Sequence, residues 1–438
     1  MQRCAIVVCQ HCKSFVMKPI TKIAVLSLAL LPVVFSACVK DSCKRLHSYS
    51  YYVPVYKTKD EVRANIKSNA PRDVTNPGKI YIRGSYIFLN DIDKGIHVID
   101  NSNPAQPHNI AFIDIPGNLD LAVKGNTLYA DLYTDIVAID ITDPLHVASK
   151  KIIENIFPYR HYGGGFVGSD ANGVIVDWVR RDTTVTESCE STFPGINIRS
   201  DVFLATSNSG GTTGGNMSSP VGQGGSMARF AIIQDRLYTV GISALDVFNI
   251  SNANNPVRGS STTISWDIET IYPFLNKLFI GSMTGMYIYD VSNPDVPIQQ
   301  GKFTHVRTCD PVIADNNFAY VTLRSGTPCQ GFTNQLDIVR LNNLSNPELV
   351  KTYNLKNPHG LSKDGNTLFI CDGSDGLKVY DVSDVNNMRL LSQVTGLETF
   401  DVIAFNKVAL VIAKDGLYQY DYTNTQSLQL LSKITVKK

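Results

Sequence analysis

The sequence predicts an all-β protein, a single β-propeller of four-stranded antiparallel blades, with eight blades and seven as the alternative. The first observation is a repeated phrase of alternating apolar residues that ends in Asp-x-Ser/Thr-Asn/Asp. Copies of this phrase begin at Ile96, Ile136, Leu245, Met286, Leu377 and Leu417. The second observation is a period of about forty residues in which only β-type segments occur, which is typical of propeller blades.

The unit that begins at Asp120 shows the elements of one blade. Residues 120–123 alternate between polar and apolar side chains, as a half-buried strand does. Residues 124–126 (Lys-Gly-Asn) predict a tight turn, because Gly and Asn accept positive φ at low cost. Two further strands follow at 128–131 and 136–140, and a fourth at 147–153 after an Asp-Pro turn. Four such strands make one antiparallel blade.

The blade count comes from the second strand of each unit. Apolar signals for this strand begin at Tyr86, Leu128, Val174, Leu237, Leu278, Ala319, Leu368 and Ala409. They predict eight blades. A single domain can contain them all, since all-β domains can exceed the usual domain size. The signal at Val174 belongs to a degenerate repeat, and without it the count is seven.

The repeated phrases resemble the LVIVD-repeat family, which is known mainly from bacterial and archaeal envelope proteins. The resemblance covers roughly residues 78–436, is specific where the Asp-x-Ser-Asn/Asp-Pro ending is intact, and is poor at 174–229. It implies a β-propeller but no activity, because propellers include both enzymes and inert scaffolds.

The N-terminal region predicts export and lipidation. Lys18 and Lys22 precede an apolar run at 23–35 that ends in Ser-Ala-Cys38. This order is typical of a signal peptide, and the run is too short to span a bilayer comfortably. Cys38 resembles a bacterial lipoprotein cleavage site, whose thiol is acylated. Residues 1–37 are therefore interpreted as a leader, with Met17 favoured as the start.

The expected location is the bacterial cell envelope. Several acyl chains hold a protein stably on a membrane, so we expect an outer-membrane lipoprotein facing the periplasm or the cell surface. Lys40-Asp41 resembles an export signal of Bacteroidetes surface lipoproteins, and a solvated tether is the alternative interpretation. Residues 38–78 form the tether, with a short helix predicted by the capping box Thr58-x-x-Glu61, and residues 79–438 form the propeller.

The charge and cysteine content limit the kinds of partner and metal site that are expected. The mature chain has 36 Lys and Arg against 39 Asp and Glu, a net charge of −3, and no basic run that would favour nucleic acid. Cys309 and Cys329 fall in one blade and are predicted to form a disulfide, as envelope proteins can. Cys371 lies within a strand and is predicted to be a small buried core residue. The spacing of Cys and His residues supports no zinc site.

The residues that start the inner strands form the candidate channel site. By superposition of the repeats they are Asp120, His161, Asp267, Asp310, His359 and Asp401. Inner strands line the channel of a propeller, so these groups could bind a ligand or a divalent cation at one mouth, or act as acid and base. The alternative is structural, with each side chain tying an incoming loop to backbone amides. No other cofactor is predicted, and no catalytic residue or resident metal is assigned.

The irregular third unit offers a second candidate region. It contains a glycine-rich stretch at 207–226 that lacks the order of a phosphate-binding loop. Long loops on rigid scaffolds often bind ligands, and a flexible linker is the alternative.

The favoured function is a lipid-anchored envelope propeller that binds a glycan, a peptide or a protein without catalysis. The alternative is an envelope hydrolase or lyase that uses His161, His359 and neighbouring aspartates, with or without a divalent cation. A purely structural subunit of an outer-membrane assembly is a third option. Neither a nucleophile elbow nor another nucleophile motif supports an enzyme.

Overall fold

The computed structural model describes residues 44–158, 160–162, 166–168, 173–188, 203–204, 223–266, 268–305, 311–325 and 333–437. The chain divides into two units. The first contains residues 1–50 and 182–198, and the second contains residues 51–181 and 199–438. The propeller lies wholly within the second unit.

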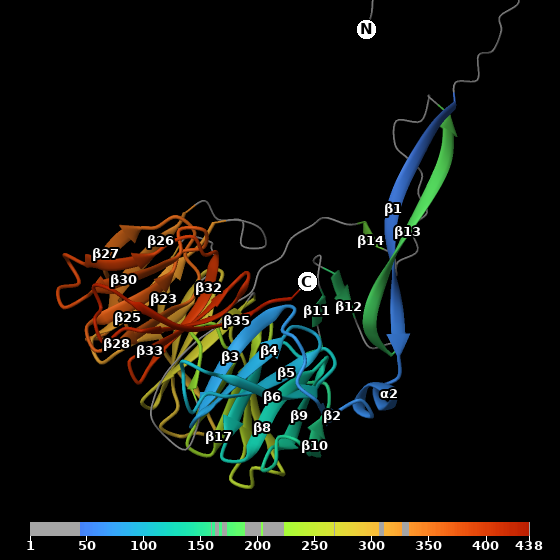
Figure 1. The fold of residues 1–438 in the computed structure, drawn as a ribbon, viewed down its shortest axis with the longest axis horizontal. Helices are drawn as coiled ribbons and strands as arrows, with labels where there is room; N and C mark the ends of the chain where they lie inside the picture. The colour runs from blue at the N-terminus through green and yellow to red at the C-terminus, as the bar shows by residue number, and fades with distance from the viewer. Residues whose placement is uncertain are drawn as a thin grey trace, which may run out of the picture. The chain divides into compact units, whose positions relative to one another are not determined.

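Each blade is an antiparallel sheet of four strands that are consecutive in the described part of the chain (Figure 1). Blade 1 contains β3 (Pro77–Arg83), β4 (Tyr86–Asp91), β5 (Gly95–Asp100) and β6 (His108–Asp114). Blade 2 contains β7 (Leu121–Lys124), β8 (Thr127–Leu132), β9 (Asp135–Asp140) and β10 (Ala148–Ile153). Blade 3 contains β16 (Phe230–Ile233), β17 (Arg236–Val240), β18 (Ala244–Asn249) and β19 (Val257–Thr263). Blade 4 contains β20 (Ile268–Phe274), β21 (Lys277–Ser282), β22 (Gly285–Asp290) and β23 (Ile298–Thr304).

The remaining three blades follow the same order. Blade 5 contains β24 (Val312–Ala314), β25 (Phe318–Leu323), β26 (Gln335–Arg340) and β27 (Glu348–Asn354). Blade 6 contains β28 (Leu361–Asp364), β29 (Thr367–Cys371), β30 (Leu377–Asp381) and β31 (Arg389–Val394). Blade 7 contains β32 (Thr399–Phe405), β33 (Val408–Ala413), β34 (Gly416–Asp421) and β35 (Gln429–Thr435). The first strand of each blade is the inner one.

The prediction of a propeller with four-stranded blades is confirmed, and the number of blades is seven, the alternative, rather than eight. The expected third unit at Val174 forms β13 (Val174–Ser188), which joins a sheet with β1 (Lys44–Lys57) and β14 (Phe203–Leu204). Its first residues are apolar, but the side chains from residue 179 to residue 186 are exposed, so it lacks the two apolar faces that a blade strand buries. Blades 2 and 3 are direct neighbours, because the Tyr129 hydroxyl donates to the Ala253 carbonyl at 2.8 Å.

The repeated phrase marks the turn between the third and fourth strands of a blade. In blade 2, Asp140 Oδ1 accepts hydrogen bonds from the amide and hydroxyl of Thr142 at 2.9 and 2.7 Å. Asp143 Oδ1 then accepts from the Leu145 amide at 2.9 Å. The hydrogen bonds from Thr142 lower the pKa of Asp140 to about 2. The first of these turns recurs at Asp100, Asn249, Asp290, Asp381 and Asp421. The signature is therefore structural, with aspartate and asparagine used as turn formers.

The ring closes by packing between blades 7 and 1. Ile80 and Ile87 of blade 1 share a buried cluster with Ile403 and Leu410 of blade 7. A parallel bridge between Val74 and Val436 adds backbone pairing beyond the last strand. All four strands of blade 7 come from the C-terminal end of the chain, so no strand is exchanged between the two ends of the propeller.

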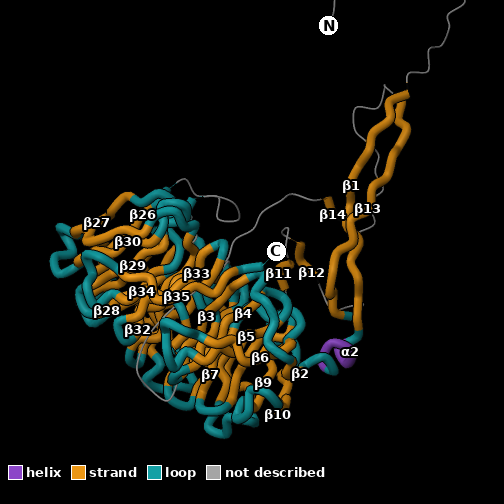
Figure 2. The backbone as a smooth tube through the Cα atoms, viewed as in Figure 1, coloured by secondary structure: helices purple, strands orange, loops and turns teal. Residues whose placement is uncertain are grey.

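Residues 59–69, which precede blade 1, pack on the propeller. The capping box at Thr58 and Glu61 starts α2 (Lys59–Arg63), which is drawn as the purple helix in Figure 2. Val62 is buried in the core cluster of blades 1 and 2, and Arg63 pairs with Asp135 of blade 2 at 2.7 Å. β2 (Lys67–Asn69) adds to the outer strand β6. No helix in the described ranges has the length and apolar content needed to span a bilayer.

Candidate functional site: the channel and the cleft beside it

Residues 223–229, the end of the glycine-rich stretch and the residues after it, lie among the inner strands. β15 (Gln223–Gly224) pairs with the inner strand β3 of blade 1. Ser226 Oγ accepts a hydrogen bond from the Leu361 amide of blade 6 at 2.8 Å, and the Ala228 carbonyl accepts from Ile271 of blade 4 at 2.8 Å. Residues 223–229 thus bridge three blades across the channel, and the channel is partly filled by its own chain.

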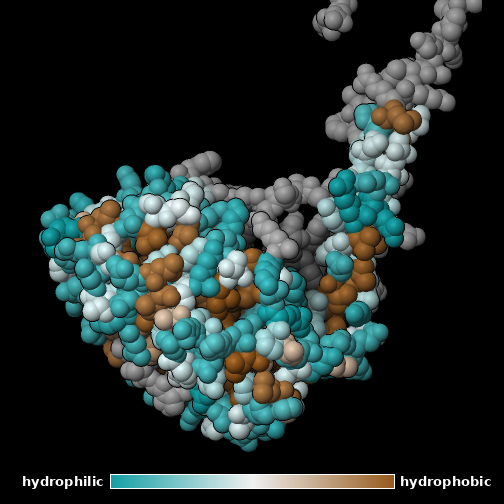
Figure 3. All heavy atoms as spheres, viewed as in Figure 1, coloured by the Kyte–Doolittle hydropathy of each residue, from teal (hydrophilic) through white to brown (hydrophobic). Residues whose placement is uncertain are grey.

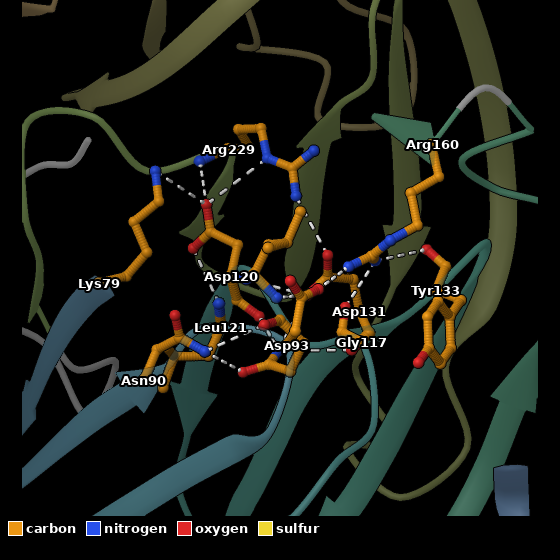
Figure 4. Close-up of polar contacts among 12 residues, drawn as sticks. Lys79, Asn90, Asp93, Gly117, Asp120, Leu121, Asp131, Tyr133, Arg160 and Arg229 are labelled. Carbon is orange, nitrogen blue, oxygen red and sulfur yellow. Dashed lines mark hydrogen bonds and ion pairs between the residues drawn. The ribbon is translucent and has the colours of Figure 1, made fainter. Parts of the chain in front are cut away.

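Asp120 lies at the start of an inner strand, as predicted, and is neutralised by two basic residues. Its Oδ2 accepts from the Arg229 backbone amide at 2.6 Å and lies 3.9 Å from both Lys79 Nζ and Arg229 Nε (Figure 4). Burial raises the pKa of Asp120, and both cations oppose that rise. Burial lowers the pKa of Lys79 to about 8, with Asp120 acting in the opposite direction. The group is a cluster of interacting charges, in which Lys79 Nζ also donates to the Met227 carbonyl at 2.7 Å.

Acidic residues at the ends of second strands hold the incoming loops. Asp131 Oδ1 accepts from the amides of Leu119 and Asp120 at 2.7 and 2.8 Å. Asp91 binds the amides of residues 75 and 76 in the same way, and Asp372 binds those of residues 356 and 357. In three blades, therefore, an acid at the end of the second strand binds the backbone amides of the incoming loop. The first residue of the inner strand was considered for this role in the sequence analysis.

His359 lies directly before inner strand β28, as predicted. Asn357 Nδ2 is 3.2 Å from its Nε2, and its ring meets the edge of Phe400 with the centroids 5.3 Å apart. Burial and the nearby positive charge of Arg324 lower the pKa of His359 to about 3. The imidazole is therefore neutral at physiological pH, and such a low pKa makes it a weak general base.

Asp401 is buried on inner strand β32 next to His359 in the ring. A Cβ atom at Gly360 would lie 2.3 Å from Asp401 Oδ1, so glycine is required where blades 6 and 7 approach each other. Asp401 also contributes to the electrostatic environment of Lys79. Asp120, Asp401 and Lys79 thus belong to one electrostatic group at the channel.

Of the other residues predicted for the channel, His161 lies elsewhere, and Asp267 and Asp310 cannot be placed. His161 lies in β11 (Arg160–Tyr162), which pairs with β12 (Phe166–Gly168) in a two-stranded sheet and is not an inner strand. The expectation failed because the unit around Val174 is not a blade, so the superposition assigned His161 to an inner strand that does not exist. Asp267 and Asp310 lie outside the described residues. In the described ranges, no cluster of three or more His, Cys, Asp or Glu side chains could hold a metal.

The sequence prediction did not include Lys79 on β3, the inner strand of blade 1, or Arg229, which directly precedes β16, the inner strand of blade 3. Both fall at the position of Asp120 when the units are aligned on their second strands, but the predicted site contained only Asp and His residues. Cys38, Cys309 and Cys329 lie outside the described residues. Cys371 is fully buried, as predicted.

A cleft of about 280 Å³ opens between blades 2 and 3, which are connected in sequence by residues 154–229. One wall comes from blade 2 and the connection after it, and includes Asp131, Tyr133 and Arg160. The other wall comes from blade 3 and includes Asp246 and Arg258. Arg229 contributes to the cleft and also to the channel cluster, so the two sites are contiguous.

The three arginines of the cleft are held by different partners. Arg160 pairs with Asp93 and donates from Nη1 to the Gly117 carbonyl at 2.5 Å (Figure 4). Arg229 Nη2 donates to Asp131 at 3.1 Å, and its guanidinium lies 5.5 Å from the Phe157 ring centroid. Arg258 Nη2 donates to Asp246 at 2.8 Å. These contacts fix the guanidinium planes, which favours recognition of a planar anion.

Comparison with protein families identifies the repeats. The LVIVD repeat model matches residues 76–111, 308–355 and 360–396, which fall in blades 1, 5 and 6. Among curated proteins, none matches the chain.

Several solved structures are similar in fold. A protein from Lactobacillus plantarum is 11% identical, with 89% of this chain and 97% of that chain covered and a TM-score of 0.50. PorZ, a surface component of the type-IX secretion system of Porphyromonas gingivalis, is 11% identical, with 83% and 39% covered and a TM-score of 0.47. BamB from Moraxella catarrhalis is 9% identical, with 86% and 97% covered and a TM-score of 0.47.

At these identities a structural match concerns the fold alone, and no activity or location follows from it. The family model contributes the repeat type, and the sheet order contributes the seven four-stranded blades. The chain is therefore a seven-bladed β-propeller with LVIVD repeats.

Proposed function

We propose that the protein is a lipid-anchored, non-catalytic binding module of the bacterial cell envelope that presents the cleft between blades 2 and 3 to a glycan, peptide or protein. The observation that supports this most is the junction between blades 2 and 3. There residues 154–229 interrupt the regular succession of blades, and a cleft lined by three arginines lies between the two blades. Concave sites with a few convergent polar groups are typical of ligand binding.

The contrast with the central channel favours the cleft. The channel contains the chain's own residues 223–229, and its Asp120 already lies within ion-pair distance of Lys79 and Arg229. The arginine side chains of the cleft are partly accessible, 42% for Arg258 and 24% for Arg229. A ligand therefore meets less competition from intramolecular contacts in the cleft than in the channel.

The ligand role is tested by filling the cleft. Ser243, which lines it, is replaced by Trp, and partners are captured by crosslinking and pull-down from native membranes. The matched control is Thr284→Trp at the corresponding turn of blade 4, where the residue is exposed. We expect the control to keep its partners and Ser243→Trp to lose at least one. Identical partner sets for both variants would contradict the proposal.

The anchor is proposed to be acylated Cys38, on the grounds of the leader and Ser-Ala-Cys order. Cys38→Ala is expected to move the protein from the membrane pellet to the soluble fraction, because acyl chains supply the membrane affinity. Cys43→Ala is the matched control and is expected to stay in the pellet. Retention of Cys38→Ala in the pellet after a high-salt wash would remove the lipid anchor from the proposal.

The alternative function, a hydrolase or lyase at the channel, has one observation in its favour. His359 is a buried imidazole whose Nδ1 has no hydrogen bond to the described residues. Its low pKa counts against a role as base, as stated above. A His359→Gln variant that loses a hydrolytic activity of the wild-type protein, with its melting temperature unchanged, would favour the enzyme.

A further inference from the structure

We infer that the cleft between blades 2 and 3 binds one neutral sugar unit, whose hydroxyl groups contact the paired side chains of Arg258 and Asp246. This inference rests on the proposed function and names the ligand chemistry of the same site. It follows from the charge balance of the lining, from the hydrogen-bonding atoms that the lining leaves unused and from the size of the cleft.

The charges around the cleft are balanced. Each arginine of the lining pairs with a carboxylate: Arg160 with Asp93, Arg229 with Asp131, and Arg258 with Asp246. Asp120, which also lies near Arg229, has Lys79 as a second cation at 3.9 Å. The fixed guanidinium planes would select an anion only if a positive charge were left over, and these pairs leave none. A charged ligand would enter without a counter-charge, whereas a neutral ligand keeps the balance.

The pair formed by Arg258 and Asp246 offers donors and acceptors side by side. Arg258 Nη2 donates to Asp246 Oδ1 at 2.8 Å, and both residues line the cleft. In the described part of the chain, Arg258 Nε and Nη1 and Asp246 Oδ2 take part in no hydrogen bond. A hydroxyl group both donates and accepts, so it can donate to the carboxylate and accept from the guanidinium. Adjacent hydroxyl groups therefore suit this pair.

Ligand groups with a single hydrogen-bonding role suit the pair less well. A carboxylate only accepts, so it would meet the lone pairs of Asp246 as well as the N–H groups of Arg258. An ammonium group only donates, so it would meet the N–H groups of Arg258 as well as the carboxylate. The pairing of the two side chains thus favours a polyhydroxylated ligand over either ion.

Further unused hydrogen-bonding groups lie around the same space. Ser243, Ser261 and Asn155 line the cleft, and among the described residues the two hydroxyls and Asn155 Nδ2 have no hydrogen-bond partner. Asn155 Oδ1 accepts from Lys59 Nζ at 3.1 Å, so the amide is held on one side and its nitrogen remains for a ligand. Phe157 adds apolar surface, against which the C–H groups of a sugar ring can pack.

The volume limits the ligand to one small unit. About 280 Å³ lies just below the range of about 300–1,000 Å³ that small-molecule sites usually have. Gly241, Ser243, Ala244 and Ser261 line the blade 3 side, and their small side chains leave the cleft open. A compact ring suits this space better than an extended peptide, which needs a longer groove.

The test is isothermal titration of the purified protein with glucose, galactose and mannose, which together vary the ring hydroxyls at C2 and C4. The matching uronates carry a carboxylate, the matching 2-amino sugars carry an ammonium group, and N-acetylglycine methylamide represents a neutral peptide. We expect at least one hexose to bind at least tenfold more tightly than its uronate, its amino sugar and the amide. Binding of none of the three hexoses, or equally tight binding of a charged sugar or the amide, would overturn the inference.

Two variants locate the site. Arg258→Met leaves Asp246 without its cation, so it is expected to weaken hexose binding at least tenfold and to lower the ratio of hexose to amino-sugar affinity. Ser243→Phe fills the cleft without changing its charge and is expected to weaken hexose binding at least tenfold, which keeps the test informative if Arg258→Met fails to fold.

Arg340→Met, which replaces an exposed arginine on β26 of blade 5, is the control and is expected to bind as the wild type does. Wild-type affinity in a folded Arg258→Met or Ser243→Phe protein would place the binding elsewhere and overturn the inference. An unchanged affinity ratio in Arg258→Met would also overturn it, because the paired charges would then not select the ligand.

The outcome is separable from that of the proposed function. If the pull-down finds a partner that depends on the cleft but no hexose binds, the ligand class is wrong and the binding role remains. If a hexose binds in the cleft but the pull-down finds no partner, the sugar site stands and the partner role fails. A disaccharide with the bound hexose at its non-reducing end, titrated beside the monosaccharide, distinguishes the end of a glycan from a free sugar.

Discussion

The junction between blades 3 and 4 and the junction between blades 2 and 3 make the same contacts at the outer side and differ at the channel side. At the regular junction, the Tyr238 hydroxyl donates to the Pro294 carbonyl at 2.9 Å. At the interrupted junction, the equivalent Tyr129 donates to the Ala253 carbonyl at 2.8 Å. The outer contact is thus independent of the length of the connection.

The difference lies in the chain that connects the blades. Blade 3 passes to blade 4 through residues 264–267, whereas blade 2 passes to blade 3 through residues 154–229. The long connection leaves a cleft and sends residues 223–229 among the inner strands. A propeller therefore accepts a long insertion where a blade ends, because the cost of loop closure grows only slowly with length.

The distribution of hydrophobic side chains on the propeller surface does not distinguish one junction from another, as the cleft does. On the face shown in Figure 3, the coloured surface is largely hydrophilic, with hydrophobic patches separated by polar side chains. Exposed apolar residues recur on outer strands, as Val257, Ile298, Leu349, Leu390 and Leu430. Their repetition indicates a property of the blade, whereas the cleft occurs at the interrupted junction.

The largest expected effect is that of Arg229→Met at the interrupted junction. Asp131 would lose its cation, and Asp120 would keep only Lys79 nearby. Leaving buried carboxylates unpaired is expected to lower the free energy of unfolding by about 3 kcal/mol. Urea denaturation measures this change.

The control for that variant is Arg236→Met at the regular junction. Arg236 binds Asp295 at 2.6 Å, but Asp295 is exposed and water can replace the arginine. A loss of no more than about 1 kcal/mol is expected. Equal losses for the two variants would mean that the interrupted junction does not depend on its charge cluster.

The next effect is that of Ser226→Ala in the segment that enters the channel. The Leu361 amide loses its acceptor and is buried, which is expected to cost about 1–3 kcal/mol. Ser260→Ala is the control, because its hydroxyl donates to the Asp295 carbonyl at 2.6 Å at an exposed position, where the expected loss is about 0.5 kcal/mol. Thermal unfolding of both variants compares them. A smaller loss for Ser226→Ala than for Ser260→Ala would indicate that residues 223–229 add nothing to the ring.

Counted per pH unit, the smallest effect concerns acid stability at the channel end of blade 6. The pKa of His359 is lowered from 6.5 to about 3 in the folded protein, so below pH 6.5 the unfolded chain binds a proton that the folded protein does not. Stability is therefore complete above pH 6.5 and falls as the pH decreases toward 3, by at most about 1.4 kcal/mol per pH unit. His359→Gln is expected to reduce this slope between pH 6.5 and 5.

Urea denaturation at several pH values measures the slope. His108→Gln is the control, because His108 is exposed at the start of β6 and should leave the slope unchanged. Parallel pH profiles for wild type and His359→Gln would show that His359 is protonated without cost and is open to water.

Features that depend on residues close together in the sequence were predicted correctly, because contacts between near neighbours are enough to form them. The capping box at Thr58 and Glu61 satisfies the first amides of α2 with neighbouring side chains, and it is present as expected. The Asp-x-Ser/Thr turns form within two residues, so the repeated phrase located the turns between third and fourth strands correctly. Cys371 was predicted to be buried because it lies within an apolar strand.

The blade count and the site depended on distant partners. Val174 begins an apolar run like that of a blade strand, and only the pairing of β13 with β1 excludes it from the ring. Asp120 could be placed at a channel from the repeat alone, but its pairing with Lys79 and Arg229 joins residues from three blades. The cleft is formed by residues up to 142 positions apart in the sequence, Leu119 to Ser261.

The sequence by itself determined the all-β class, the four-stranded blade and the turn between its third and fourth strands, because each depends on contacts within about forty residues. Only the tertiary structure decided that the ring has seven blades, that residues 223–229 lie among the inner strands and that the channel acids are neutralised. Those features depend on which blades become neighbours when the ring closes, and this is set by packing between distant segments rather than by any local pattern.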